Sequence, residues 1–226
     1  RLVWELVMKL DDTQRAAIGE AVRMAEAGTD GEIMVVTAAS SDAYHDVALH
    51  WAVLAMLLVL ALLASFPDFY LGLLGGWQFE WTRRELFTLA LILAAAKFLG
   101  VRLILAWRPL RLALTPRATK ARRVRRRAIQ LFRAGIERRT ATRTGVLLYI
   151  SEDEHRAEIV ADAAIHAQVP NERWGTAMAA LVDALRAGRP ADGIIAAISE
   201  IGAILAETFP KTGTDPDELP DRLIEI

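Results

Sequence analysis

Two long apolar stretches dominate the pattern of hydrophobic and polar positions along the chain. The residues at 47–66 include no Asp, Glu, Lys or Arg, and those at 86–107 include only Lys97 and Arg102 as charged residues. An α-helix rises about 1.5 Å per residue, so about 20 helical residues cross the ~30 Å hydrocarbon core of a bilayer. The pattern therefore predicts a transmembrane helical hairpin over residues 47–107, with one span at 47–66 and the other at 86–107.

The segment between the two spans contains proline, glycine and a cluster of aromatic residues. The aromatic residues are Phe66, Phe69, Tyr70, Trp77, Phe79 and Trp81. Such rings favour the headgroup boundary of a membrane, where an apolar ring and a polar edge are both accommodated. A pair of core helices in a soluble protein is the alternative, and the aromatic cluster favours the hairpin. A cleaved signal peptide is not expected, because 46 residues with their own helix and strand pattern precede the first span.

The remaining stretches alternate between helical and strand patterns, as in an α/β domain. Residues 10–46 predict the first part of that domain, residues 108–207 its remainder, and residues 208–226 an extended C-terminal tail. The hairpin is thus expected as an insertion after the first strand. The predicted elements are a helix from Asp11 to Gly28, a strand at 32–37, a basic helix at 118–139, strands at 145–151 and 156–162, a short helix or turn at 163–168, and helices from Asn171 to Ala187 and from Asp192 to Glu207.

The composition indicates that part of the chain lies in a lipid membrane. Apolar residues make up 54% of the chain and the mean hydropathy is +0.26, whereas a soluble domain usually lies a little below zero. Cysteine is absent, which excludes disulfide scaffolds, thiolate metal sites and cysteine nucleophiles.

The net charge of −1 hides three blocks of very different charge. Residues 1–107 hold 8 basic and 12 acidic residues, residues 108–143 hold 13 and 1, and residues 144–226 hold 6 and 15. The basic block directly follows the second span, whereas the connector has only Arg83 and Arg84 as basic residues. By the positive-inside rule, the basic block and both termini are cytoplasmic, and the connector faces outward.

The basic helix at 118–139 carries arginines around an apolar stripe. Its candidate contacts to a partner or to lipid are Arg122, Arg123, Arg125, Arg126 and Arg127. Contact with nucleic-acid phosphates is the alternative, but no aromatic residue is interleaved with these arginines. A basic stretch next to a membrane span is explained by topology and by anionic lipid. We therefore expect anionic lipid headgroups, and no nucleic acid, as partners of this helix.

Two basic residues interrupt the second span. Lys97 is the twelfth residue of that span, about 16 Å into the bilayer, where a lysine costs on the order of 2.5–3.5 kcal/mol. Arg102 lies closer to the cytoplasmic end and can snorkel to the interface. Lys97 either snorkels too, in a tilted or shallow helix, or meets an acid of a partner subunit, because the first span offers none. Both residues are therefore candidate contacts to lipid or to a partner.

The sequence motifs of the common enzyme classes are absent. The chain has no Walker A loop, no G-x-S-x-G elbow, no H-E-x-x-H pair and no G-x-G-x-x-G fingerprint. Its weak candidates for catalytic residues are Asp30 and Glu32, which flank the start of the first strand, and Asp162, which shares a helical face with His166. A polar loop and a surface pair are the plainer interpretations. The run at 152–155 (EDEH) is typical of an exposed hairpin turn, and we expect neither a cofactor nor a metal.

Four short motifs occur in a characteristic order and spacing. They are Thr29–Ile33 (TDGEI), Arg143–Leu148 (RTGVLL), Glu158–Asp162 (EIVAD) and Glu218–Asp221 (ELPD). Together they resemble the TPM-domain family, and more narrowly its bacterial membrane branch, which carries a transmembrane hairpin inside the domain. The resemblance implies an α/β fold, a TPM-like sandwich with a small mixed sheet flanked by helices. It also implies a multi-pass protein of the bacterial inner (cytoplasmic) membrane.

The functions that the resemblance implies are diverse. Plant thylakoid-lumen members are linked to photosystem II repair and to weak acid phosphatase activity, and an animal member is an auxiliary subunit of an acetylcholine-gated channel. Bacterial members often accompany LemA-type membrane proteins. Many members have an acid two residues before the glycine of the second strand, where this chain has Arg143. A fixed positive charge in place of a cation ligand argues against metal-assisted phosphatase chemistry.

Two functions follow as hypotheses. The first is a non-enzymatic accessory, assembly or repair subunit of a larger membrane protein complex, with a LemA-type membrane protein among the candidate partners. The second is a weak membrane-bound phosphatase or other hydrolase that uses Asp30, Glu32 or Asp162.

Overall fold

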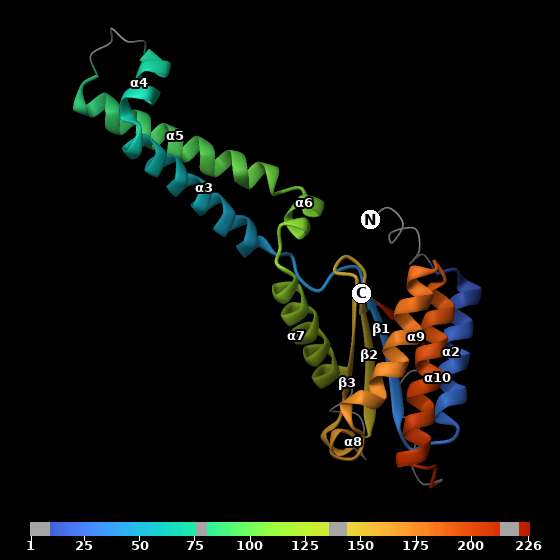
Figure 1. Ribbon diagram of the computed structural model, residues 1–226. Coiled ribbons are helices and arrows are strands. Elements are labelled where there is room, and N and C mark those ends of the chain that lie inside the picture. Colours follow the sequence, from blue (N-terminus) through green and yellow to red (C-terminus); the bar gives the residue numbers. More distant parts are fainter. Residues whose placement is uncertain (1–9, 76–80, 136–143, 213–221) are drawn as a thin grey trace. The chain divides into compact units, whose positions relative to one another are not determined.

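The chain forms two compact units in a computed structural model (Figure 1). The first, called the sheet unit below, joins Arg1–Asp42 to Ala118–Ile226, and the second, called the hairpin unit, is Ala43–Arg117. The structure describes residues 10–75, 81–135, 144–212 and 222–226.

A four-stranded mixed sheet forms the centre of the sheet unit, with the strand order β3-β2-β1-β4. β1 and β2 are parallel, β3 is antiparallel to β2, and β4 is parallel to β1. The strands are β1 (Glu32–Ala38), β2 (Gly145–Ser151), β3 (Arg156–Ala161) and β4 (Ile224–Glu225). The predicted fold class, a small mixed sheet flanked by helices, is therefore confirmed.

The fourth strand was not predicted. Ile224 and Glu225 pair with Val36 and Thr37 of β1, in a tail that was expected to be merely extended. A strand of two residues is too short to show an alternation of apolar and polar residues, so only its pairing with β1 reveals it.

Side chains alternate between the two faces of the sheet, and different helices cover each face (Figure 1). On one face, Ile33 and Val35 belong to one core with α2, α9 and α10. On the other face, Met34, Val36 and Tyr149 pack with the apolar side of α7. The helices of the sheet unit are α2 (Asp12–Glu26), α7 (Arg117–Gly135), α8 (Ala163–Gln168), the 3-10 turn η1 (Asn171–Arg173), α9 (Trp174–Arg186) and α10 (Pro190–Thr208).

Several helix ends differ from the predicted ones. Asn171 does not cap a helix but begins the separate turn η1, and α9 begins at Trp174. The last helix begins at Pro190 rather than at Asp192, because proline suits the first helical position, where an N–H has no partner in the helix. The first helix begins after Asp11 as predicted, and Asp11 and Gln14 form a capping box there.

The hairpin unit contains two helices that are long and apolar enough to cross a membrane, α3 (His45–Ser65) and α5 (Arg83–Ile104). The helix α4 (Pro67–Gly75) follows α3, where the proline and glycine residues predicted only a connector, and α6 (Arg108–Ala113) follows α5. α5 begins three residues before the predicted span at 86, because Thr82 and Glu85 form a capping box.

Candidate functional site

The three candidate acids lie at one edge of the sheet. Asp30 precedes β1, Glu32 is its first residue, and Asp162 directly follows β3. β1 and β2 begin at the edge where the antiparallel β3 ends, so the acids share that edge. Thr144 and Gly145 connect them: the Thr144 hydroxyl donates to the Asp30 carbonyl at 2.9 Å, and the Gly145 N–H donates to the Asp162 carboxylate at 3.0 Å.

The Asp30 carboxylate binds the beginning of the C-terminal tail. It accepts hydrogen bonds from the Thr212 hydroxyl at 2.6 Å and from the Thr212 N–H at 3.0 Å. These bonds, first of all that of the hydroxyl, lower the pKa of Asp30 from its ordinary value. Asp30 is therefore ionised at neutral pH, which suits an anchor of the tail better than a general acid.

Glu32 and Asp162 are both buried, with 8% and 6% of their surface exposed. A buried carboxylate is costly unless hydrogen bonds or charges compensate it. Besides accepting the Gly145 N–H, Asp162 donates its own N–H to the Gly145 carbonyl at 3.0 Å, and it occupies the N-cap position of α8. Asp162 thus fixes the end of β3 and the beginning of α8 to β2.

A groove of about 720 Å³ lies beside Asp162, between α7, β3 and α8. Arg133, Asp162 and His166 are its charged or titratable lining residues, so Asp162 and His166 share a surface. A guanidinium, a carboxylate and an imidazole are groups that can bind a small anion and move a proton. Within the described ranges, no three His, Asp or Glu side chains gather as metal ligands would. Arg143 lies outside the described residues.

The opposite edge of the sheet holds a buried polar network around Glu154. Its carboxylate accepts hydrogen bonds from the Ser40 hydroxyl and the Ser41 N–H, each at 3.1 Å, and from the Ser151 hydroxyl. The Ser41 hydroxyl also lies 3.0 Å from the phenol oxygen of Tyr149, whose pKa is raised by burial. The EDEH run does form a turn, as predicted, but Glu154 is 6% exposed and points into the protein. No local pattern indicates this role of Glu154, because Ser40 and Ser41 lie more than one hundred positions away in the chain.

The network fixes the segment that leads from β1 to the hairpin unit. Ser40 and Ser41 precede Asp42, the last residue of the first part of the sheet unit. Asp42 in turn forms a salt bridge of 2.5 Å with Arg123 of α7. The chain is therefore held on both sides of the insertion, by Glu154 before it and by Arg123 after it.

The arginines of α7 divide into two groups. Arg123 pairs with Asp42 and is only 25% exposed. The other four candidate arginines, Arg122, Arg125, Arg126 and Arg127, are exposed, while Val124, Ala128 and Phe132 face the sheet. Arg125 lies 3.7 Å from Glu158, whose pKa is raised by burial and lowered to a smaller extent by the arginine. Arg123 and Arg125 thus each have a carboxylate partner within the fold, and Arg122, Arg126 and Arg127 are the exposed arginines expected to contact anionic headgroups.

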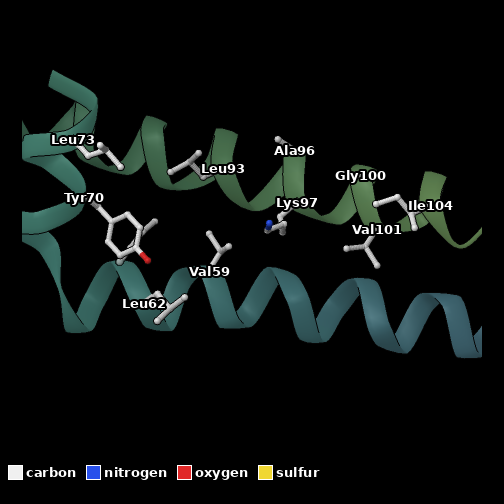
Figure 2. Close-up of a pocket in the computed structure, with 11 residues that line it drawn as sticks. Val59, Leu62, Tyr70, Leu73, Leu93, Ala96, Lys97, Gly100, Val101 and Ile104 are labelled. Atoms are coloured by element: carbon white, nitrogen blue, oxygen red, sulfur yellow. The ribbon is translucent and has the colours of Figure 1, made fainter. Parts of the chain in front are cut away.

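The basic residues of α5 have different surroundings. Arg102 donates a hydrogen bond to the His45 carbonyl at the beginning of α3, at 3.4 Å. Lys97 lines a cavity of about 510 Å³ between α3, α4 and α5, and Figure 2 shows its side chain in the space between α5 and α3. Lys97 lies seven residues, or about 10 Å, before the end of α5, and its depth in a bilayer stays a prediction.

Replacing Glu154 with alanine leaves the Ser40, Ser41 and Ser151 donors without their acceptor in a buried place. We expect Glu154→Ala to lower the free energy of unfolding by about 1–3 kcal/mol, measured by urea unfolding of the full chain in detergent. Glu172 is exposed, so Glu172→Ala is the control and should change the free energy of unfolding by less than about 0.5 kcal/mol. Equal stability of the two variants would contradict the role assigned to Glu154.

The comparisons with known proteins agree with this fold. Residues 110–204 match the TPM domain. No curated protein matches the chain. The chain resembles the solution structure of the BA42 protein from the psychrophilic bacterium Bizionia argentinensis, with a TM-score of 0.56, 19% identity and 96% of each chain covered. At that identity the likeness shows the fold alone. The TPM domain predicted from the sequence is thus confirmed over residues 110–204, while the membrane branch of the family stays a prediction.

Proposed function

We propose that this chain is a membrane-anchored accessory, assembly or repair subunit of a larger membrane protein complex. In this proposal it is non-enzymatic, α3 and α5 span the bacterial inner membrane, and the sheet unit lies on the cytoplasmic face. The observation that carries the proposal is the apolar surface of the hairpin unit. Among the described residues, 16 of the 19 large apolar side chains that are exposed lie between Leu49 and Trp107.

An apolar surface of this extent needs a nonpolar environment. Soluble monomers rarely expose contiguous apolar patches beyond a few hundred Å². Here the exposed side chains include Leu57, Leu58, Phe87, Leu91 and Leu103, which are each more than half exposed. They come from both long helices rather than from one face of one helix. A bilayer covers such a surface on all sides, as a single docking partner would not.

The charge distribution supports the orientation. The chain after α5 contains α6 and α7, with Arg108 and Arg111 in the first and the exposed arginines in the second. The connector side has Arg83 and Arg84 opposed by Asp68 and Glu85. The excess of positive charge therefore follows the second span, as in segments that remain in the cytoplasm. Anionic lipid headgroups are the expected contacts of the exposed arginines.

Three carboxylates at the ends of the sheet strands already have hydrogen-bond partners within the fold. Asp30 binds Thr212, Asp162 binds the Gly145 amide, and Glu154 binds Ser40, Ser41 and Ser151. Carboxylates that hold loops in place by hydrogen bonds suit a rigid adaptor protein. The partner expected for it is a membrane protein complex or a LemA-type membrane protein.

Native co-purification tests this proposal. The full chain with a C-terminal tag, extracted in mild detergent, should elute with one membrane complex at fixed stoichiometry. Deletion of the protein should lower the amount of that complex in the membrane. A protein that elutes alone and monodisperse, and whose loss changes no membrane complex, would contradict the accessory role.

A weak hydrolase is the second candidate, because the structure brings Asp30, Glu32 and Asp162 to one sheet edge. The groove beside Asp162 offers Arg133 for a phosphate group and His166 for proton transfer. If this site acts, Asp162→Asn or His166→Ala should reduce phosphatase turnover at least about tenfold, since a positioned acid or base contributes 10²–10⁴-fold. The matched control is Glu172→Ala. Turnover that survives replacement of all three acids excludes the site.

A further inference from the structure

The cavity of the hairpin unit follows a continuous stripe along α5. Its α5 residues are Leu93, Ala96, Lys97, Gly100, Val101 and Ile104, which recur at helical spacing on one side of the helix. α3 contributes Val59, Leu62 and Leu63, and α4 contributes Tyr70 and Leu73 (Figure 2). This cavity is itself an open groove, called the hairpin groove below, which runs between the two long helices, and α4 borders one end of it.

Lys97 places a cation within this apolar lining. Among the described residues, no ion pair or hydrogen bond of its ammonium group is found, whereas Arg102 binds the His45 carbonyl. Side chains on a helix tilt towards its N-terminus, so Lys97 leans away from the Ile104 end of α5. Snorkelling to the headgroups at that end would run against this tilt. A negative group inside the hairpin groove would compensate the charge where it lies.

The dimensions of the hairpin groove select the kind of occupant. From Leu93 to Ile104 the hairpin groove is about 16 Å long. Its volume of about 510 Å³ then corresponds to a mean cross-section of about 31 Å². The space therefore accommodates one extended hydrocarbon chain.

We propose that the hairpin groove binds one long-chain fatty acid, with its carboxylate on the Lys97 ammonium and its chain along the apolar section lined by Val59, Leu62, Tyr70 and Leu93. A mostly apolar cavity of this size with a single well-placed charge is typical of a small-molecule site. A phospholipid brings two chains, and its phosphate stays at the interface, whereas Lys97 lies about 10 Å inside α5. The inference rests on the proposed function only in requiring that the hairpin lies in the bilayer.

Photolabelling tests the site. The full chain is placed in nanodiscs of phosphatidylcholine and labelled with a palmitic acid that carries a diazirine, and labelled peptides are mapped by mass spectrometry. We expect labels on α3 and α5 beside the hairpin groove. Lys97→Met should reduce them by about tenfold, which corresponds to about 1.4 kcal/mol of binding, and Lys97→Arg should retain them. The methyl ester of the same probe should label weakly.

Two further variants separate the hairpin groove from its charge. Gly100→Leu places a side chain in the cavity and should therefore also reduce labelling. The variant should fold, because a Cβ atom at this position meets no atom within 4 Å outside its own helix backbone. Arg102→Met, which removes a nearby charge outside the cavity lining, should leave labelling unchanged.

Each alternative has its own outcome. Equal labelling of the parent chain and Lys97→Met would show acyl-chain contact without a site and overturn the inference. Unchanged labelling in Lys97→Met together with loss of a co-purifying complex would assign Lys97 to an acid of a partner protein instead. Extraction of the protein from membranes by alkaline carbonate would overturn the membrane placement itself. Failure of the proposed function is thereby distinguished from failure of this site.

Discussion

The parallel pairing of β1 with β2 is the constraint on which the rest of the structure depends. Two parallel neighbours cannot be joined by a tight turn and need a long crossover. In this chain the crossover contains the whole hairpin unit and α7, between Ala38 and Gly145. Both strands are buried along their full length, so their register cannot slip without exposing one core or the other. The sheet therefore stays intact although the chain leaves it for more than one hundred residues.

The insertion is tolerated because polar contacts fix the chain where it leaves and returns. Glu154 holds Ser40 and Ser41 after β1, and Arg123 of α7 holds Asp42. At the other edge, Asp30 and Asp162 hold the tail and α8. The candidate acids Asp30 and Asp162 thus have structural partners, and the groove beside Asp162 and the cavity beside Lys97 each offer space for a ligand.

Local patterns predicted much of this fold, and contacts over long sequence distances account for most of what they missed. The apolar run at 145–151, the helix that begins at Asp11 and the two apolar helices all arise from neighbouring residues, and local patterns predict each of them. β4 was not, because a strand of two residues exists only through its pairing with Val36. The role of Glu154 was missed for the same reason, since its partners come from β2 and from the segment after β1. The earlier beginning of α5 does have a local cause, the capping box of Thr82 and Glu85, which the apolar pattern of the span does not include.

Cysteine labelling tests the proposed topology, in which α3 and α5 cross the membrane and the sheet unit lies in the cytoplasm. The chain has no cysteine, so a single introduced thiol reports its own location. Asp68→Cys in α4 and Glu172→Cys in η1 are both at exposed positions. With a membrane-impermeant maleimide on intact spheroplasts, the account predicts labelling at position 68 at once and at position 172 only after lysis. Labelling of position 172 in intact cells, or recovery of both variants in the soluble fraction, would contradict it.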